Sequence, residues 1–264
     1  MRMIILLLFS VSLALAKVTV AVSIASQQWM VKNIAGDLAD VIVIVPAGVD
    51  AHSYEPKPAQ MAELSKAHIY LACGLEFEKA WIGKLTSAAP NLKVYYTDQG
   101  FAKVGGDTHI WVSKAGTRVM VQATMKALSE ADVKNAGTYQ INGMKLLQAV
   151  DRTFSQAISM LAQYNGRAFM VNHPALGYFA ADYKLRQIAI DKNGEAKPAD
   201  IAAAVEAAKK EKITMIFAIS GESDKSAQAV ANEIGAKVEK ISVTDDDWEQ
   251  MIGAIATQLI LSFN

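Results

Sequence analysis

One long amphipathic stretch divides this chain into two halves, and it limits the possible folds more than any other feature. It covers residues 135–165, where apolar side chains recur at steps of three and four residues and give a predicted helix one apolar face. Gly143 is the only helix-breaking residue between Thr138 and Tyr164. A helix between those two residues would be about 40 Å long, the width of a small protein. The pattern predicts two lobes joined by one long, rigid helix.

Short β-rich segments alternate with helical segments on both sides of this stretch. Their continuous apolar runs are typical of parallel strands that are covered on both faces. The predicted strands are 17–24, 41–45, 68–73, 93–96, 167–171, 185–190, 213–219 and 237–243. Connections of this length favour βαβ units. We therefore predict an α/β fold of two Rossmann-like lobes, with residues 17–133 as the N-terminal lobe, 134–165 as the linking helix and 166–264 as the C-terminal lobe.

Local signals mark the ends of several predicted helices. Ser26 is a candidate N-cap for a helix that follows the first strand. Pro198 starts an alanine-rich helix, a position that suits its fixed φ angle. Gly235 fits the C-terminal stop of the helix after the strand 213–219.

The first sixteen residues have the pattern of a cleaved export signal. Arg2 is followed by an apolar run, and Ala14-Leu15-Ala16 supplies the small residues that signal peptidase accepts. The run is shorter than the roughly 20 residues that span a bilayer. We expect export to the periplasm with Lys17 as the new N-terminus. Cys73, the only cysteine, lies far from this point, so we expect no lipid anchor.

The charge balance excludes some classes of partner. The chain has 26 basic and 26 acidic residues and no basic block. Nucleic acids and anionic membranes attract strongly basic surfaces, so neither is an expected partner.

Histidine is scarce in this chain, which draws attention to where it occurs. Of the four histidines, His52 and His173 follow predicted strands, where open α/β sheets bind ligands. His109 follows a glycine-rich loop, whereas His68 opens a strand and receives no ligand role. Neutral imidazole is the commonest zinc ligand, and manganese is better served by oxygen. His52, His109 and His173 are too far apart in the sequence to form a local metal-binding motif. Each of them could instead cap a helix or bond a backbone group.

The segments around these histidines resemble the three metal-ligand segments of a known family, in the same order. The family is the cluster A-I, or cluster 9, substrate-binding proteins of ABC transporters, which bind zinc or manganese. The similar segments are PAGVDAHSYEPKPAQM (46–61), DTHIWVSK (107–114) and VNHPALGYFAADYKL (171–185). Two later segments, 195–218 and 223–238, are similar to the helix–strand units that follow in the family.

The resemblance implies a receptor rather than an enzyme. It makes His52, His109 and His173 the metal ligands, in a cleft between the lobes. Histidine at the third position is similar to the zinc-selective branch, because manganese binders of the family tend to carry glutamate there. The resemblance further implies Zn²⁺ as the transported ligand, delivery to an inner-membrane ABC permease for zinc uptake, and a monomer in the periplasm.

Several features depart from the family pattern. Thr108 and Lys114 stand where the family often has proline. The histidine-rich loop that many zinc binders carry before the second ligand is missing here. Ser242 stands where the family often has a fourth ligand, an aspartate. The remaining candidates for that fourth ligand are water, Glu55, Glu222, Asp245, Asp246 and Asp247.

Two alternative functions use the same residues. A manganese- or iron-binding receptor would keep the fold and change the cargo. A periplasmic zinc-dependent hydrolase would use the three histidines with an open water position, and Glu55 or Glu222 as the base. No nucleophile or oxyanion-hole motif supports the hydrolase.

Overall fold

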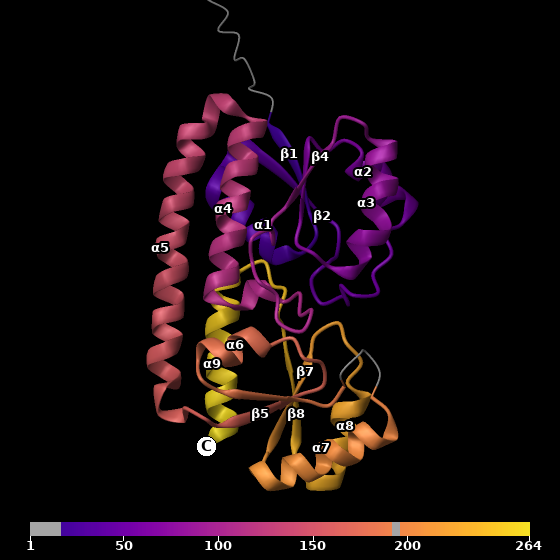
Figure 1. Cartoon of the computed structure of the whole chain (residues 1–264), viewed down its shortest axis with the longest axis vertical. Coiled ribbons are helices and arrows are strands. Elements are labelled where there is room, and N and C mark those ends of the chain that lie inside the picture. Colours follow the sequence, from indigo (N-terminus) through magenta and orange to yellow (C-terminus); the bar gives the residue numbers. More distant parts are fainter. Residues whose placement is uncertain (1–16, 192–195) are drawn as a thin grey trace, which may run out of the picture.

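Two four-stranded parallel sheets, placed one beyond the other along the molecule, form its framework (Figure 1). The computed structural model describes residues 17–191 and 196–264. The predicted export signal, residues 1–16, lies outside the described residues. The two parallel sheets with their covering helices confirm the predicted two-lobe α/β fold class.

The first sheet has the strand order β2-β1-β3-β4. Its strands are β1 (Val18–Val22), β2 (Ala39–Val43), β3 (Ile69–Ala72) and β4 (Lys93–Tyr96). Val20 of β1 is fully buried and lies opposite both Val41 and Ile69, as expected of a central strand. The helices of this half are α1 (Ala25–Ala35), α2 (Pro58–Leu64), α3 (Glu76–Ala88) and α4 (Lys114–Ala131).

The second sheet repeats the same connectivity, with the order β6-β5-β7-β8. Its strands are β5 (Ala168–Val171), β6 (Arg186–Ala189), β7 (Met215–Ile219) and β8 (Lys237–Ile241). Its helices are α6 (Gly177–Asp182), α7 (Pro198–Glu211), α8 (Lys225–Ile234) and α9 (Trp248–Phe263). In each sheet the second and third strands of the chain lie on opposite sides of the first strand. Such a reversal of strand order creates a crevice beyond the carboxyl ends of the central strands.

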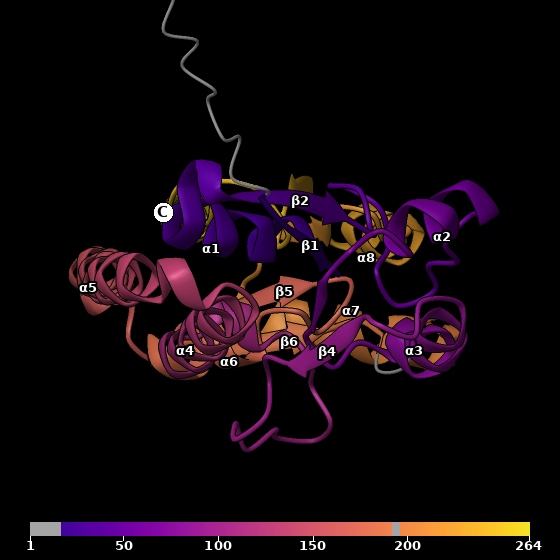
Figure 2. The same cartoon turned by 90° about the horizontal axis from the view of Figure 1, so that it is seen from above.

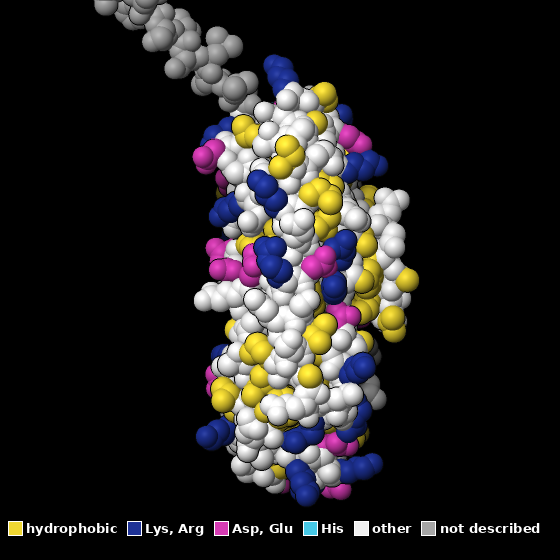
Figure 3. Space-filling model, turned by 90° about the vertical axis from the view of Figure 1, so that its left-hand side faces the viewer, with side chains coloured by type: hydrophobic (Ala, Val, Ile, Leu, Met, Phe, Trp, Pro, Cys, Tyr) yellow, Lys and Arg dark blue, Asp and Glu magenta, His cyan; other side chains and the backbone are white. Residues whose placement is uncertain are grey.

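Helix α5 (Ala136–Leu161) runs along both lobes and is continued by one 3₁₀ turn, Ala162–Tyr164 (Figure 1). It packs against α4, α1 and α9. Seen from above, α4 and α5 lie at one side of the molecule and α2 and α3 at the other (Figure 2). On the outer face that α5 covers, hydrophobic side chains are scattered between charged ones (Figure 3).

A second chain segment crosses between the lobes, and tryptophans hold it there. After β8 the chain reaches the N-terminal half, where Trp111 Nε1 donates a hydrogen bond to the carbonyl of Val243 at 2.5 Å. Trp248 Nε1 donates in return to the carbonyl of Trp111 at 2.7 Å. Helix α9 then runs back beside α5 (Figure 1). The lobe boundaries at residues 133 and 166 stay a prediction, because this segment contacts both halves.

Local helix signals were partly right. Pro198 is the first residue of α7, and Gly235 ends α8 with a φ of 71° in the left-handed region. The N-cap role predicted for Ser26 is wrong, because α1 already begins at Ala25. Ser26 is buried and its hydroxyl donates to the carbonyl of Asp245 at 3.1 Å, which ties α1 to the crossing segment.

The described residues were also searched for membrane-crossing helices. Within 17–191 and 196–264, no helix combines the length and apolarity that a span requires.

Candidate metal centre

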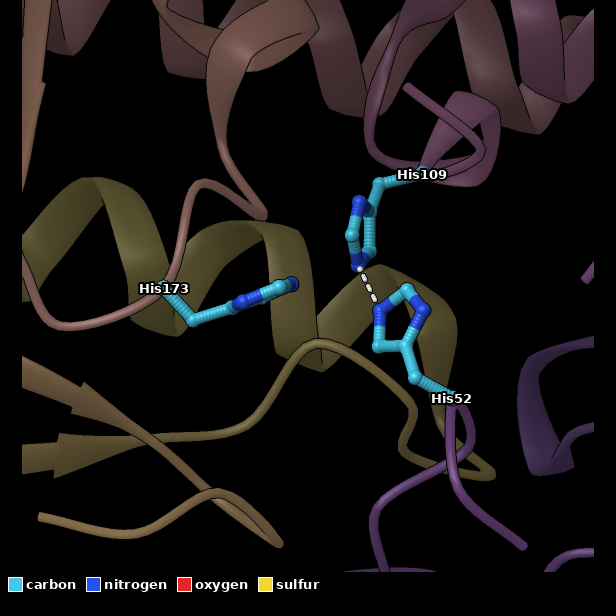
Figure 4. Close-up of side chains that lie close together, drawn as sticks. All are labelled: His52, His109 and His173. Atoms are coloured by element: carbon cyan, nitrogen blue, oxygen red, sulfur yellow. Dashed lines mark hydrogen bonds between the residues drawn. The ribbon is translucent and has the colours of Figure 1, made fainter. Parts of the chain in front are cut away.

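Three loops from different strands bring His52, His109 and His173 together (Figure 4). His52 lies in the loop after β2, His109 follows the loop after β4, and His173 lies two residues beyond β5. One ring nitrogen from each lies within 4.8 Å of the others. The Nε2 atoms of His52 and His109 are 3.2 Å apart. The rings point toward one another, as ligands of a shared ion would.

An aspartate two residues before each of the first two histidines holds its loop. Asp50 Oδ1 accepts a hydrogen bond from the backbone N–H of His52 at 2.7 Å. Asp107 Oδ1 accepts the equivalent bond from His109 at 2.9 Å, and it also lies 2.7 Å from His109 Nδ1. A carboxylate on one ring nitrogen fixes the orientation of the other. Nε2 of His109 is thereby directed at His52.

His173 is placed by its neighbour Asn172, whose side chain ties two strand ends together. Asn172 Oδ1 accepts a hydrogen bond from the backbone N–H of Ile219 at 2.8 Å, and its Nδ2 donates to the carbonyl of Ser223 at 2.9 Å. The carboxylate of Asp191 lies beside His173, with Oδ1 3.5 Å from Nδ1. That distance is at the outer limit of a hydrogen bond.

Both ring nitrogens of His173 are buried, and no described residue satisfies them with a hydrogen bond. A buried polar atom left without a partner costs about 1–3 kcal/mol. Such a cost is recovered if an electrophilic ligand binds the ring. This is the observation in the structure that most directly indicates a ligand role for His173.

The electrostatics favour neutral imidazole at one position. Burial lowers the pKa of His52 to about 4, and the nearby rings of His109 and His173 act in the same direction. Burial also lowers the pKa of His173, but the carboxylates of Asp191 and Glu222 outweigh it, so that its pKa is raised. At neutral pH His52 is therefore deprotonated, which is the form that binds metal.

The three rings line a small cavity between the lobes. Its volume is about 20 Å³, room for roughly one water-sized ligand. Two acidic residues, Asp50 and Glu222, are among the lining residues. Burial first, and then the adjacent carboxylate of Asp50, raise the pKa of Glu222 to about 7. The cavity suits a single ion and has no space for an organic substrate.

The other residues considered from the sequence lie elsewhere. Glu55 is exposed and does not line the cavity. Asp245 accepts a hydrogen bond from Ser242 at 2.7 Å, Asp247 caps α9, and Asp246 is exposed. His68 accepts a hydrogen bond from the backbone N–H of Thr19 at 2.9 Å, in agreement with the structural role predicted for it.

A two-lobed α/β protein with convergent imidazoles in an interlobe cavity defines a class, the metal-binding substrate-binding proteins. A sequence profile described as "Zinc-uptake complex component A periplasmic" (ZnuA) matches residues 20–260. The chain belongs to this family, whose members are substrate-binding receptors of metal ABC transporters rather than enzymes. The resemblance seen in the sequence is thus confirmed.

Different relatives of the chain are named for different metals. A crystal structure of ZnuA matches with a TM-score of 0.91 and 35% identity, over 94% of this chain and 100% of that one. The chain is 29% identical to a putative metal-binding protein of Treponema pallidum, covering 89% of this chain and 82% of that protein. It is 28% identical to the zinc-binding lipoprotein AdcA of Streptococcus pneumoniae, over 82% of this chain and 48% of AdcA. It is 25% identical to the iron-binding protein YfeA of Yersinia pestis, over 80% of this chain and 72% of YfeA.

Proposed function

We propose that this protein is the periplasmic zinc receptor of an ABC transporter, with His52, His109 and His173 as its zinc ligands. It takes up Zn²⁺ in the interlobe cavity and delivers the ion to an inner-membrane permease for zinc uptake. The convergence of three ring nitrogens within 4.8 Å carries this proposal. Export with removal of residues 1–16, the absence of a lipid anchor and a monomeric state belong to the same proposal.

Ligand chemistry supports zinc over other cargoes. Three imidazoles are a familiar zinc ligand set, while manganese favours carboxylate and water oxygens. The family profile and the likeness to AdcA point to the same metal. A manganese- or iron-binding receptor is the second candidate, and the likeness to YfeA favours it. A hydrolase has no support, because the cavity of about 20 Å³ leaves no room for a substrate.

Isothermal titration of chelator-stripped protein, residues 17–264, with Zn²⁺ and separately with Mn²⁺ tests the proposal. We expect tight one-to-one binding of zinc and weak binding of manganese. The variants His52→Ala, His109→Ala and His173→Ala should each lose most of the zinc affinity. The matched control is His68→Ala, which removes an imidazole outside the cavity. Zinc binding that is indifferent to the three cavity variants would contradict the ligand assignment, and tighter binding of manganese would favour the second candidate.

A further inference from the structure

The loop after β7 forms the wall of the cavity on the side of the C-terminal lobe. Ile219, Ser220 and Glu222 line the cavity together with Val49 and Asp50 of the loop that carries His52. Ser220 donates its backbone N–H to the carbonyl of Ile241 at 2.8 Å, which anchors the start of this wall to β8. Because the carbonyl of Ser223 accepts a hydrogen bond from Asn172 Nδ2, the segment that carries Glu222 is held at both ends.

Gly221 permits the two loops to touch. Its φ is +95°, a conformation that favours glycine. A Cβ atom at this position would lie 2.7 Å from the backbone nitrogen of Asp50 and 2.7 Å from the carbonyl carbon of Val49. The backbones of the two lobes thus meet directly beside the three imidazoles. This contact sets the carboxyl group of Glu222 against that of Asp50, within hydrogen-bonding reach.

The other carboxylates around the site already have partners on the histidines or on the loop that carries His52. Asp107 is bonded to His109, and Asp191 faces Nδ1 of His173. Asp50 accepts hydrogen bonds from the backbone of His52 and from the hydroxyl of Ser53. Glu222 also lines the cavity, and its carboxyl group contacts the carboxyl group of Asp50. It is only half-buried and can turn.

We propose that Glu222 is the oxygen donor that completes the metal site, a role that rests on the proposed function. Its carboxylate leaves Asp50 and turns to the ion that the three imidazoles hold. The site then has three nitrogen donors and one oxygen donor, in the four-coordinate arrangement that zinc favours. Glu222 also provides a negative charge inside a cavity whose other donors are neutral.

The oxygen donor gives a signature that a merely structural residue would not. Manganese depends more on carboxylate than zinc does. The substitution Glu222→Gln should therefore weaken zinc binding by at least the roughly 10- to 100-fold that follows the loss of a group that supports a ligand, because Glu222 is proposed to be a donor itself. It should weaken manganese binding by a larger factor, so that the ratio of the two affinities shifts toward zinc.

The test compares the wild-type protein with Glu222→Gln, Glu222→Asp and Asp224→Asn by metal titration and by the visible absorption of bound Co²⁺. Glu222→Asp keeps the charge but shortens the side chain. Asp224→Asn is the matched control, since it removes one negative charge from the same loop and Asp224 pairs with the surface residue Lys240. Unfolding midpoints of the metal-free proteins show whether each variant is folded.

We expect both Glu222 variants to change the Co²⁺ spectrum and the zinc-to-manganese ratio, and Asp224→Asn to change neither. Equal losses for both metals with an unchanged Co²⁺ spectrum would overturn the assignment of Glu222 as a ligand. A Glu222→Gln variant that is indistinguishable from the wild type would overturn it as well. The proposed receptor function would still stand in that case if the wild type binds one zinc ion and His109→Ala loses that binding. A wild-type protein that binds no zinc would overturn both proposals.

Discussion

Each candidate ligand has a carboxylate beside it, on its loop or facing its ring. Asp50 accepts a hydrogen bond from the backbone N–H of His52. Asp107 is bonded to the backbone N–H and to Nδ1 of His109, and Asp191 faces Nδ1 of His173. Asp107 contacts the ring itself, so it fixes the orientation of the His109 ring and raises the basicity of Nε2. Asp50 holds the backbone of the loop that carries His52. Under the proposed function, the metal affinity of the site therefore depends on residues that are not ligands.

Asp107 provides the sharpest test of this dependence. Asp107→Asn should lower zinc affinity by roughly 10- to 100-fold while one ion per protein still binds, because His109 loses the charge that fixes its ring. The measurement is zinc titration with a competing chelator. Asp40→Asn is the control, since Asp40 pairs with Lys17 at the surface. An affinity equal to that of the wild type would show that Asp107 does not orient the ligand.

The pKa of His52, lowered to about 4, predicts an unusual titration in the metal-free protein. The unfolded chain takes up this proton near pH 6.5 and the folded chain only near 4, so His52 destabilises the fold as the pH falls through that range. The ring protons of His52 should not titrate in NMR spectra between pH 8 and 5.5. A peptide of residues 46–58 should show the ordinary midpoint, and a midpoint near 6.5 in the folded protein would refute the prediction.

Part of this site was visible in the sequence. The spacing Asp-x-His occurs at Asp50–His52 and again at Asp107–His109, so two of the supporting acids could have been found beside their histidines. Asp191 and the cavity-lining Glu222 could not be placed in the same way. They follow β6 and β7, and only the order of strands in the folded sheet brings them to His173 and Asp50.

His109 immediately precedes the 3₁₀ turn Ile110–Val112, and this turn packs against α4. Gly116, in the first turn of α4, makes this packing possible. A Cβ atom there would lie 2.1 Å from the backbone oxygen of Ile110, too close for any real side chain. The position of His109 therefore depends on a residue seven places further along the chain.

Gly116→Ala should push this turn off α4 and displace His109. We expect the free energy of unfolding to fall by about 1–3 kcal/mol, as for other overpacked sites, and zinc affinity to fall with it. The matched change Gly253→Ala lies in α9 where a Cβ meets nothing within 4 Å. It should stabilise the protein by about 0.5–1 kcal/mol, because alanine is the better helix former. Denaturant unfolding and zinc titration of both variants check this, and equal behaviour of the two would contradict it.

The strands were predicted well because most are short apolar runs, and β4 (Lys93–Tyr96) agrees with its prediction to the residue. Helix α1 shows why some details failed. The expected cap, Ser26, is used for a tertiary contact, while Gln27 Oε1 accepts the backbone N–H groups of Ser23 and Ile24. Local sequence rules cannot anticipate a partner such as Asp245 that lies more than two hundred residues away.

Over the whole molecule, the two lobes share one large hydrophobic core. Side chains of both halves, among them Trp29, Trp111, Phe154 and Trp248, belong to the same buried cluster. The rings of Trp29 and Trp248 are 5.1 Å apart, and those of Phe154 and Trp248 are 5.6 Å apart. Lobes that share a core in this way should not unfold independently.

We therefore expect a single unfolding transition in denaturant, with the same midpoint by tryptophan fluorescence and by far-ultraviolet circular dichroism. Trp248→Phe removes the donor to the carbonyl of Trp111 and should lower the free energy of unfolding by about 1–3 kcal/mol. Trp81→Phe is the control, because Trp81 is a partly buried residue of α3 whose ring lies under Lys84. Two separate transitions in the wild type would show that the lobes are independent.

The size of the cavity has a consequence for supply. A space of about 20 Å³ holds an ion with little else, so zinc that arrives complexed with citrate, an amino acid or a thiol must leave that carrier at the entrance. Under the proposed function, the rate of loading then follows the exchange chemistry of those carriers as well as the total zinc around the protein. A receptor of this shape measures how much zinc is available for exchange.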